Sequence, residues 1–178
     1  MVNFKLLIIT AAIGLISIIF GIIGLATPKW IGVEVVSGGM NTVYGLFRQC
    51  TVVATGTTCT SVPTFKTAQG LQIAGVVIIA VGVISFTILK LLSRNSYLHL
   101  ISPVLPIIGS ILILIGFLLY PKYVIELYST NLMKLQVNIG YSMVLMVIAC
   151  IGGFLTAIYF AFSAGYSYCY NHSSFELS

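Results

Sequence analysis

Residues 6–27 read LLIITAAIGLISIIFGIIGLAT, and this stretch contains no charged side chain. A helix needs about 20 residues to cross the hydrocarbon core of a bilayer, and a charge at its centre costs about 2.5–3.5 kcal/mol on insertion. Three further uncharged stretches follow, at Thr67–Leu89, Leu100–Tyr120 and Leu135–Phe175. The sequence therefore predicts an integral membrane protein that crosses the bilayer four times.

Charge is scarce throughout the chain of 178 residues: 6% of them are charged, against about 25% in soluble domains. The net charge of +5 is spread over the connecting segments and forms no run, which argues against nucleic acid as a partner. The length leaves room for one membrane domain, residues 1–178, that includes a modest loop region. A signal peptide has a shorter apolar core, of about 7–15 residues, so we expect the first stretch to remain as a spanning helix.

The predicted spans are about 6–26, 68–92, 100–120 and 137–160, with loops at about 27–67 and 121–136 and a tail at about 166–178. An even number of spans places both termini on one side. The raw count of Lys and Arg near the span ends opposes cytoplasmic termini, although Lys90 and Arg94 sit densely in a short link. The two cysteines of the long loop instead favour a loop outside the cell, because disulfides persist in oxidising compartments. We therefore expect extracellular loops and cytoplasmic termini.

The long loop has the pattern of strands rather than of a helix. Strand-forming runs alternate with Gly-containing turns: Val33–Val36, Ser37–Gly39, Met40–Ala54, Thr55–Gly56 and Cys59–Val62. This alternation predicts a small antiparallel sheet. Cys50 and Cys59 flank the Thr55–Gly56 turn, so a disulfide would join adjacent strands; two free thiols are the alternative. Closing the ten-residue ring would remove about 2.7 kcal/mol of denatured-state freedom.

Small residues on the spans indicate where helices can approach closely in lipid. The fourth stretch carries five of them at four-residue spacing: Ala149, Gly153, Ala157, Ala161 and Gly165. This spacing predicts a helix-packing stripe, either within the bundle or toward another protein. Other small residues in the first two stretches are Gly14, Gly21, Gly24, Gly70 and Ala74.

The four uncharged stretches offer no Asp, Glu, Lys or Arg at membrane depth, where transporters and proton relays usually need such groups. The chain has no Cys-x-x-Cys pair, no His-Glu-x-x-His helix and no phosphate-cradling Gly loop. We therefore expect no enzyme activity, no catalytic residues, no cofactor and no metal site. Cys169, just past the fourth span, is either a palmitoylation site or an inert thiol.

Within the long loop, Trp30 is followed by Gly45-Leu46-Phe47, two residues, Cys50, eight residues and Cys59. This order resembles the claudin signature W…GLW-x-x-C…C. The signature marks the wider superfamily of claudins, peripheral myelin protein relatives and stargazin-like channel subunits. Phe47 stands where the signature has its second Trp, and one residue fewer than expected separates the cysteines.

The resemblance implies an all-α transmembrane four-helix bundle, left-handed, with a small extracellular antiparallel β-sheet. The sheet would come mainly from the first extracellular loop, with one strand from the second. Trp30 and the Gly45-Leu46-Phe47 motif would anchor it against the outer ends of the helices. Trp30 as a simple interface anchor, with no role in the sheet, is the alternative.

The resemblance also implies a claudin-like protein of cell–cell junctions in the plasma membrane. Copies would associate with one another, or with related claudin-like proteins, within one membrane and between two. They would form a paracellular barrier or a charge-selective path, for which the candidate lining charges are Lys29, Glu34, Arg48 and Lys66. The alternative is an auxiliary, stargazin-like subunit that modulates an ion channel or receptor.

Overall fold

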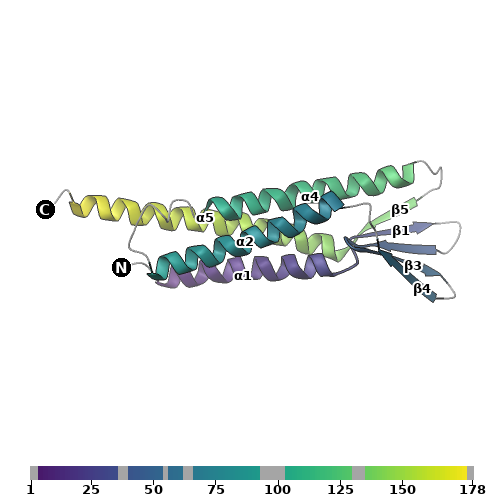
Figure 1. The fold of residues 1–178 in the computed structure, drawn as a ribbon, viewed down its shortest axis with the longest axis horizontal. Helices are drawn as coiled ribbons and strands as arrows, with labels where there is room; N and C mark the ends of the chain where they lie inside the picture. The colour runs from purple at the N-terminus through teal and green to yellow at the C-terminus, as the bar shows by residue number, and fades with distance from the viewer. Residues whose placement is uncertain are drawn as a thin grey trace.

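A computed structural model of the chain shows four long helices side by side, with a small sheet at one end of them (Figure 1). The structure describes residues 4–35, 40–53, 56–61, 66–92, 103–129 and 135–175. The helices are α1 (Phe4–Ala26), α2 (Lys66–Leu92), α4 (Val104–Ser129) and α5 (Tyr141–Phe175). All four are long and apolar enough to cross a membrane. The prediction of a multi-pass membrane protein that contacts the bilayer is confirmed.

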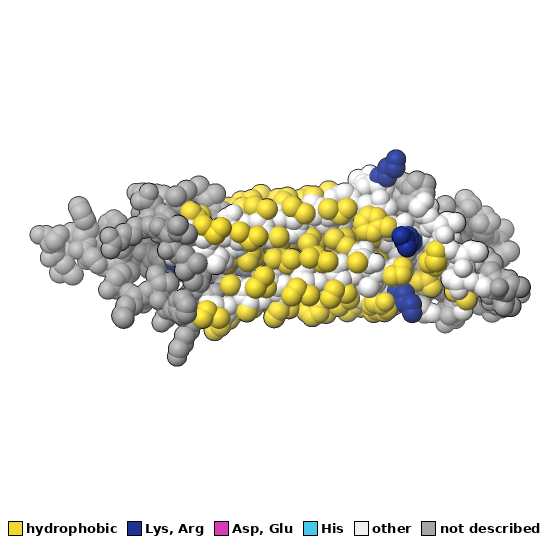
Figure 2. Space-filling model, turned by 60° about the horizontal axis from the view of Figure 1, so that its bottom comes forward, with side chains coloured by type: hydrophobic (Ala, Val, Ile, Leu, Met, Phe, Trp, Pro, Cys, Tyr) yellow, Lys and Arg dark blue, Asp and Glu magenta, His cyan; other side chains and the backbone are white. Residues whose placement is uncertain are grey.

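The helices pack as a ring in which each contacts two neighbours, in the order α1, α2, α4 and α5. The buried side chains inside this ring form one cluster that includes Ile79, Ile113, Met146 and Phe160. The outer surface is also apolar, and Figure 2 shows its side chains as a broad band on one face of the helices. Ile84, Leu118 and Phe162 are among these exposed residues. An apolar exterior of this kind is stable against lipid tails, which are as apolar as leucine.

Glycines hold α2 against α4. A Cβ built on Gly75 would lie 2.7 Å from the Gly109 carbonyl oxygen, and a Cβ on Gly109 would lie 2.7 Å from the Gly75 carbonyl oxygen. Gly82 and Gly116, each two turns further along its helix, lie close to side chains of the opposite helix, Pro106 and Gln72. The two backbones therefore approach most closely at Gly75 and Gly109, where a larger residue would force the helices apart.

Gln72 of α2 lies over Gly116 and is fully buried, yet neither atom of its amide has a hydrogen-bond partner among the described residues. A buried, unpaired polar group costs about 1–3 kcal/mol. We therefore expect Gln72→Met, which keeps the length and removes the amide, to raise the free energy of unfolding by about 1 kcal/mol. Denaturant titration of the purified protein in mixed micelles measures this change.

Gln69, one turn earlier in α2, supplies the matched control because its amide is satisfied. Its Nε2 donates to the Leu46 carbonyl at 2.7 Å. Gln69→Met should therefore lower the free energy of unfolding, by about 1 kcal/mol. Equal effects of the two substitutions would contradict this account of Gln72.

The predicted packing stripe of α5 is buried at one end only. Three of its residues are buried and two are exposed: Ala149, Gly153 and Ala157 against Ala161 and Gly165. A four-residue step turns a helix by about 400°, so such a line drifts by about 40° at each step. The buried line instead continues through Phe160 and Ala164.

The small residues predicted on α1 and α2 also differ in whether they face a neighbouring helix. Gly14, Gly21 and Gly24 face side chains of neighbouring helices, whereas Gly70 faces open space. Gly14 lies against Val83, and Gly21 lies against Val76. Spacing within one helix therefore located the contacts of α1 but missed those of α2, which are made by Gly75 and Gly82.

The helices and strands of the structure differ from the predicted span bounds at three places. Pro121 does not begin a loop, because α4 continues through it to Ser129; proline keeps a helical φ, and neighbouring groups in membrane helices commonly satisfy the freed carbonyl. Residues 137–139 are not part of a span but of strand β5 (Leu135–Ile139), which pairs with the long loop. Most of the predicted tail is helical, since α5 extends to Phe175.

The sheet has five strands in the order β4-β3-β2-β1-β5, all antiparallel. The long loop provides four of them: β1 (Ile31–Val35), β2 (Met40–Tyr44), β3 (Arg48–Val53) and β4 (Gly56–Ser61). The run 40–54, read as one strand-rich segment, divides at Gly45 into β2 and β3. Gly56 has a φ of 150° and opens β4 opposite Val53, which explains a glycine there. The predicted bundle with a small antiparallel sheet is confirmed.

Candidate functional site

Trp30 lies where the sheet meets the bundle, a region that we call the junction. The helix α1 ends at Ala26, and the chain then turns so that the Trp30 amide donates to the Tyr44 carbonyl at 2.9 Å. The side chain is fully buried, and its Nε1 donates back to the Gly24 carbonyl at 2.9 Å. Its ring lies 4.9 Å from that of Tyr120, tilted by 58°, a favourable arrangement for aromatic pairs. One residue therefore contacts α1 and α4 through its side chain and the sheet through its backbone amide.

Gly45 forms the turn between β2 and β3 directly above the bundle. Its amide donates to the Arg48 carbonyl at 2.8 Å, and its own carbonyl accepts from the Tyr120 hydroxyl at 3.0 Å. A Cβ at this position would lie 2.6 Å from the Pro28 Cα, so only glycine fits. The turn is thus held by backbone contact on one side and by a buried tyrosine on the other.

The next two motif residues behave differently. Leu46 is buried, and its carbonyl accepts a hydrogen bond from Gln69 of α2. Phe47 is 40% exposed. The structure therefore brings Trp30, Gly45 and Leu46 together at the junction, and Phe47 is the partly exposed member of the motif.

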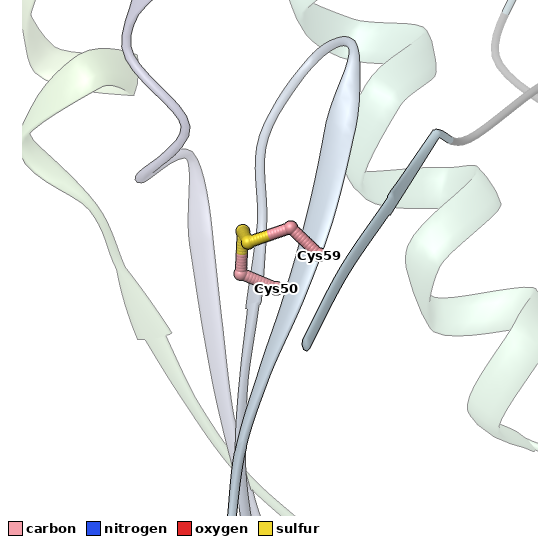
Figure 3. Close-up of a disulfide and its surroundings, with 2 residues drawn as sticks. All are labelled: Cys50 and Cys59. Carbon is pink, nitrogen blue, oxygen red and sulfur yellow. A yellow bond between two sulfur atoms is a disulfide. The ribbon is translucent and has the colours of Figure 1, made fainter. Parts of the chain in front are cut away.

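Cys50 and Cys59 form the predicted disulfide between β3 and β4 (Figure 3). They are directly opposed in the ladder, and their Cα atoms are 4.1 Å apart. The strand β4 is exposed along its whole length and lies at one edge of the sheet. A hairpin with so little packing is marginal in water, so the cross-link supplies restraint that burial does not.

Loss of this disulfide should loosen β3 and β4 and leave the helices in place. In the chain-entropy model the ring of Cys50–Cys59 contributes about 2.7 kcal/mol. Hydrogen exchange of the intact protein, compared before and after reduction, measures the effect without any substitution. We expect faster exchange in β3 and β4 after reduction and unchanged exchange in α2. Equal protection of the hairpin in both states would contradict a stabilising role.

Three of the four candidate path-lining charges, the basic ones, lie close to the bundle rather than far out on the sheet. Lys29, Arg48 and Lys66 are exposed at the junction, and Figure 2 shows basic side chains gathered just beyond the apolar band. The Lys29 Nζ lies 5.9 Å from the centre of the Tyr141 ring. Glu34 pairs with Asn41 and Gln136 in the ladder, and its side chain lies outside the described part.

The remaining predictions concern cysteine chemistry and metals. Cys169 falls in the last turns of α5, and its side chain lies outside the described part of the structure. Within the described ranges no three His, Cys, Asp or Glu side chains come together. Cys150 is a free cysteine, buried with its thiol 3.4 Å from the Ser110 carbonyl.

Two contributors to the junction were missed by sequence reasoning. Tyr120 closes the predicted third span, and its hydroxyl contacts the Gly45 turn. Gly140 donates to the Trp30 carbonyl at 2.8 Å and leaves room for the backbone of Lys29. A tyrosine at the end of an apolar stretch and a glycine between a strand and a helix are the signals that point to them.

In comparisons with known proteins, the chain matches no family model and no curated protein.

Proposed function

We propose that this chain is a claudin-like junction protein that associates with copies of itself to seal the space between cells. The observation that carries this proposal is the rigid attachment of a cross-linked sheet to a four-span bundle through Trp30, Gly45 and Leu46. A sheet attached to the bundle in this way projects from the membrane in a fixed direction (Figure 1). A fixed projection supports contact between sheets on facing membranes.

The orientation in this proposal rests on the disulfide. A cross-link between Cys50 and Cys59 persists in an oxidising compartment, which supports a sheet outside the cell. The proposal puts both termini in the cytoplasm, because α1 begins and α5 ends at the opposite end of the bundle (Figure 1).

The positions of the basic residues favour a barrier over a charge-selective path. Lys29, Arg48 and Lys66 lie at the base of the sheet, next to the apolar band. Charges at headgroup level are screened by salt beyond about 8 Å under physiological conditions. Their influence on ions that pass between the outer parts of two sheets is therefore small.

Expression of the chain alone in cells that lack junctions tests the proposal. We expect enrichment at cell contacts, intramembrane strands in freeze-fracture images and a rise in transepithelial resistance in a monolayer. The Cys50→Ser/Cys59→Ser variant leaves the four spans unchanged, so it should reach the membrane. It should form fewer intramembrane strands than the parent protein. An even surface distribution with no strands for the parent protein would contradict the proposal.

An auxiliary subunit of an ion channel or receptor is the second candidate, and one observation favours it. Ala161 and Gly165 of α5 and Gly70 of α2 are small residues that face away from the bundle. Such surfaces suit close contact with a helix of another membrane protein. Under this alternative the chain changes currents only when its channel is co-expressed, and Gly165→Leu abolishes that change.

A further inference from the structure

Four basic residues lie at one level around the junction, although they come from four separate segments. The Arg48 carbonyl accepts a hydrogen bond from the Gly45 amide, and the Gly45 turn lies against Pro28, the neighbour of Lys29. Two bonds link the same turn to the helices that carry the other cations. Tyr120, two residues before Lys122, contacts the Gly45 carbonyl, and Gln69, three residues after Lys66, contacts the Leu46 carbonyl. We call Lys29, Arg48, Lys66 and Lys122 the basic collar.

All four members of the basic collar are exposed. Figure 2 shows basic side chains standing where the apolar band ends and the sheet begins. Two partly exposed aromatic rings, Tyr141 and Phe47, share this level. Basic and aromatic side chains in a ring above an apolar band are what the headgroup layer of a bilayer selects.

We propose that the basic collar binds the phosphate groups of phospholipids in the leaflet on the sheet side, and prefers lipids with a net negative headgroup. The geometry supports a lipid as the ligand. The apolar band contacts the acyl chains directly below the four cations, so the phosphate groups lie at the level of the basic collar. Each phosphate oxygen at that height accepts a charge-assisted hydrogen bond from an ammonium or guanidinium group. Attraction of this kind is worth about 1 kcal/mol for each basic residue near an anionic surface.

This binding fixes the depth of the protein in the bilayer. With phosphates held at the level of Lys29 and Lys66, the Trp30 ring lies at the border of the hydrocarbon. The basic collar also accounts for the excess of Lys and Arg on the loop side of the chain. These residues act there as lipid ligands rather than as determinants of orientation.

Trp30 is the only tryptophan in the chain, and it lies at the height of the basic collar, so it serves as the donor for an energy-transfer measurement. The protein is reconstituted in phosphatidylcholine vesicles that carry a trace of dansyl-labelled phosphatidylglycerol or, separately, of dansyl-labelled phosphatidylcholine. We expect about five-fold enrichment of the anionic label around the protein, the factor that one such cation supplies. Rising salt should remove most of this preference.

The quadruple variant Lys29→Gln/Arg48→Gln/Lys66→Gln/Lys122→Gln should bind both labels equally. The matched control, Lys5→Gln/Lys90→Gln, removes charge at the opposite end of the bundle and should keep the preference. Absence of a preference in the parent protein, or a preference that salt does not reduce, overturns the proposal. An equal loss in the control and the quadruple variant also overturns it. The salt series needs no variant and decides the matter even if the quadruple variant fails to fold.

Discussion

Replacement of Trp30 by alanine should lower the free energy of unfolding by about 3–5 kcal/mol, the range found for large buried aromatic residues. The indole is fully buried, stacks at a tilt on Tyr120 and donates to the Gly24 carbonyl. Alanine would leave a cavity where α1, α4 and the sheet meet. It would also leave the Gly24 carbonyl without its side-chain donor. Titration of the purified protein with denaturing detergent, followed by circular dichroism, measures the loss.

Two matched substitutions separate the contributions of the indole. Trp30→Phe keeps an aromatic ring against Tyr120 and loses only the N–H donor and some volume, so we expect a cost of about 1 kcal/mol from the lost bond. Ile84→Ala removes an apolar side chain that is 57% exposed on the outer surface of α2, and its effect in micelles should be small. If Trp30→Ala were no more damaging than Ile84→Ala, the junction would not depend on this residue.

Replacement of Gly140 by alanine should cost about 3 kcal/mol, the upper part of the range for over-packing. A Cβ at this position would lie 2.6 Å from the carbonyl carbon of Lys29 and 2.9 Å from the carbonyl oxygen of Trp30. These are backbone atoms, which cannot turn aside as a flexible side chain can. The same backbone also carries the bond from the Gly140 amide to the Trp30 carbonyl, at 2.8 Å. The substitution should therefore separate β5 from β1 and shift the emission of Trp30.

Gly70→Ala is the control for this prediction. Gly70 lies in α2 with no atom within 4 Å of a built Cβ. Alanine there should be neutral or should stabilise the helix by up to about 1 kcal/mol. Equal destabilisation by the two substitutions would show that the cost at Gly140 does not come from contact with the backbone of Lys29.

The four spans could be predicted because charge at membrane depth is so costly that its absence over 20 residues is informative. The ends of the spans were harder, because they depend on partners. Leu135–Ile139 alternates apolar and polar residues, which is the pattern of a half-buried strand. The segment carries no charge, so it was counted with the uncharged stretch that follows it. Only its pairing with β1 distinguishes it from the start of a helix.

The junction was predictable in part. The order of Trp30, Gly45, Leu46 and the two cysteines is a sequence pattern, and the disulfide predicted between Cys50 and Cys59 is present in the structure. The glycine contacts between α2 and α4 were not found, since a spacing of two turns in each helix has meaning only when the two helices are aligned. The same reasoning explains the stripe of α5, where position on the helix alone could not show which of its residues meet a neighbour.

The central claim is that the chain crosses the bilayer four times and holds its cross-linked sheet outside the cell. A variant with Cys150→Ala and Cys169→Ser keeps only Cys50 and Cys59 as cysteines. Intact cells that express it are treated with a membrane-impermeant reductant and then with a membrane-impermeant maleimide. The account predicts that both cysteines are labelled to the same extent in intact and permeabilised cells. Labelling that requires permeabilisation would place the sheet in the cytoplasm and contradict the account.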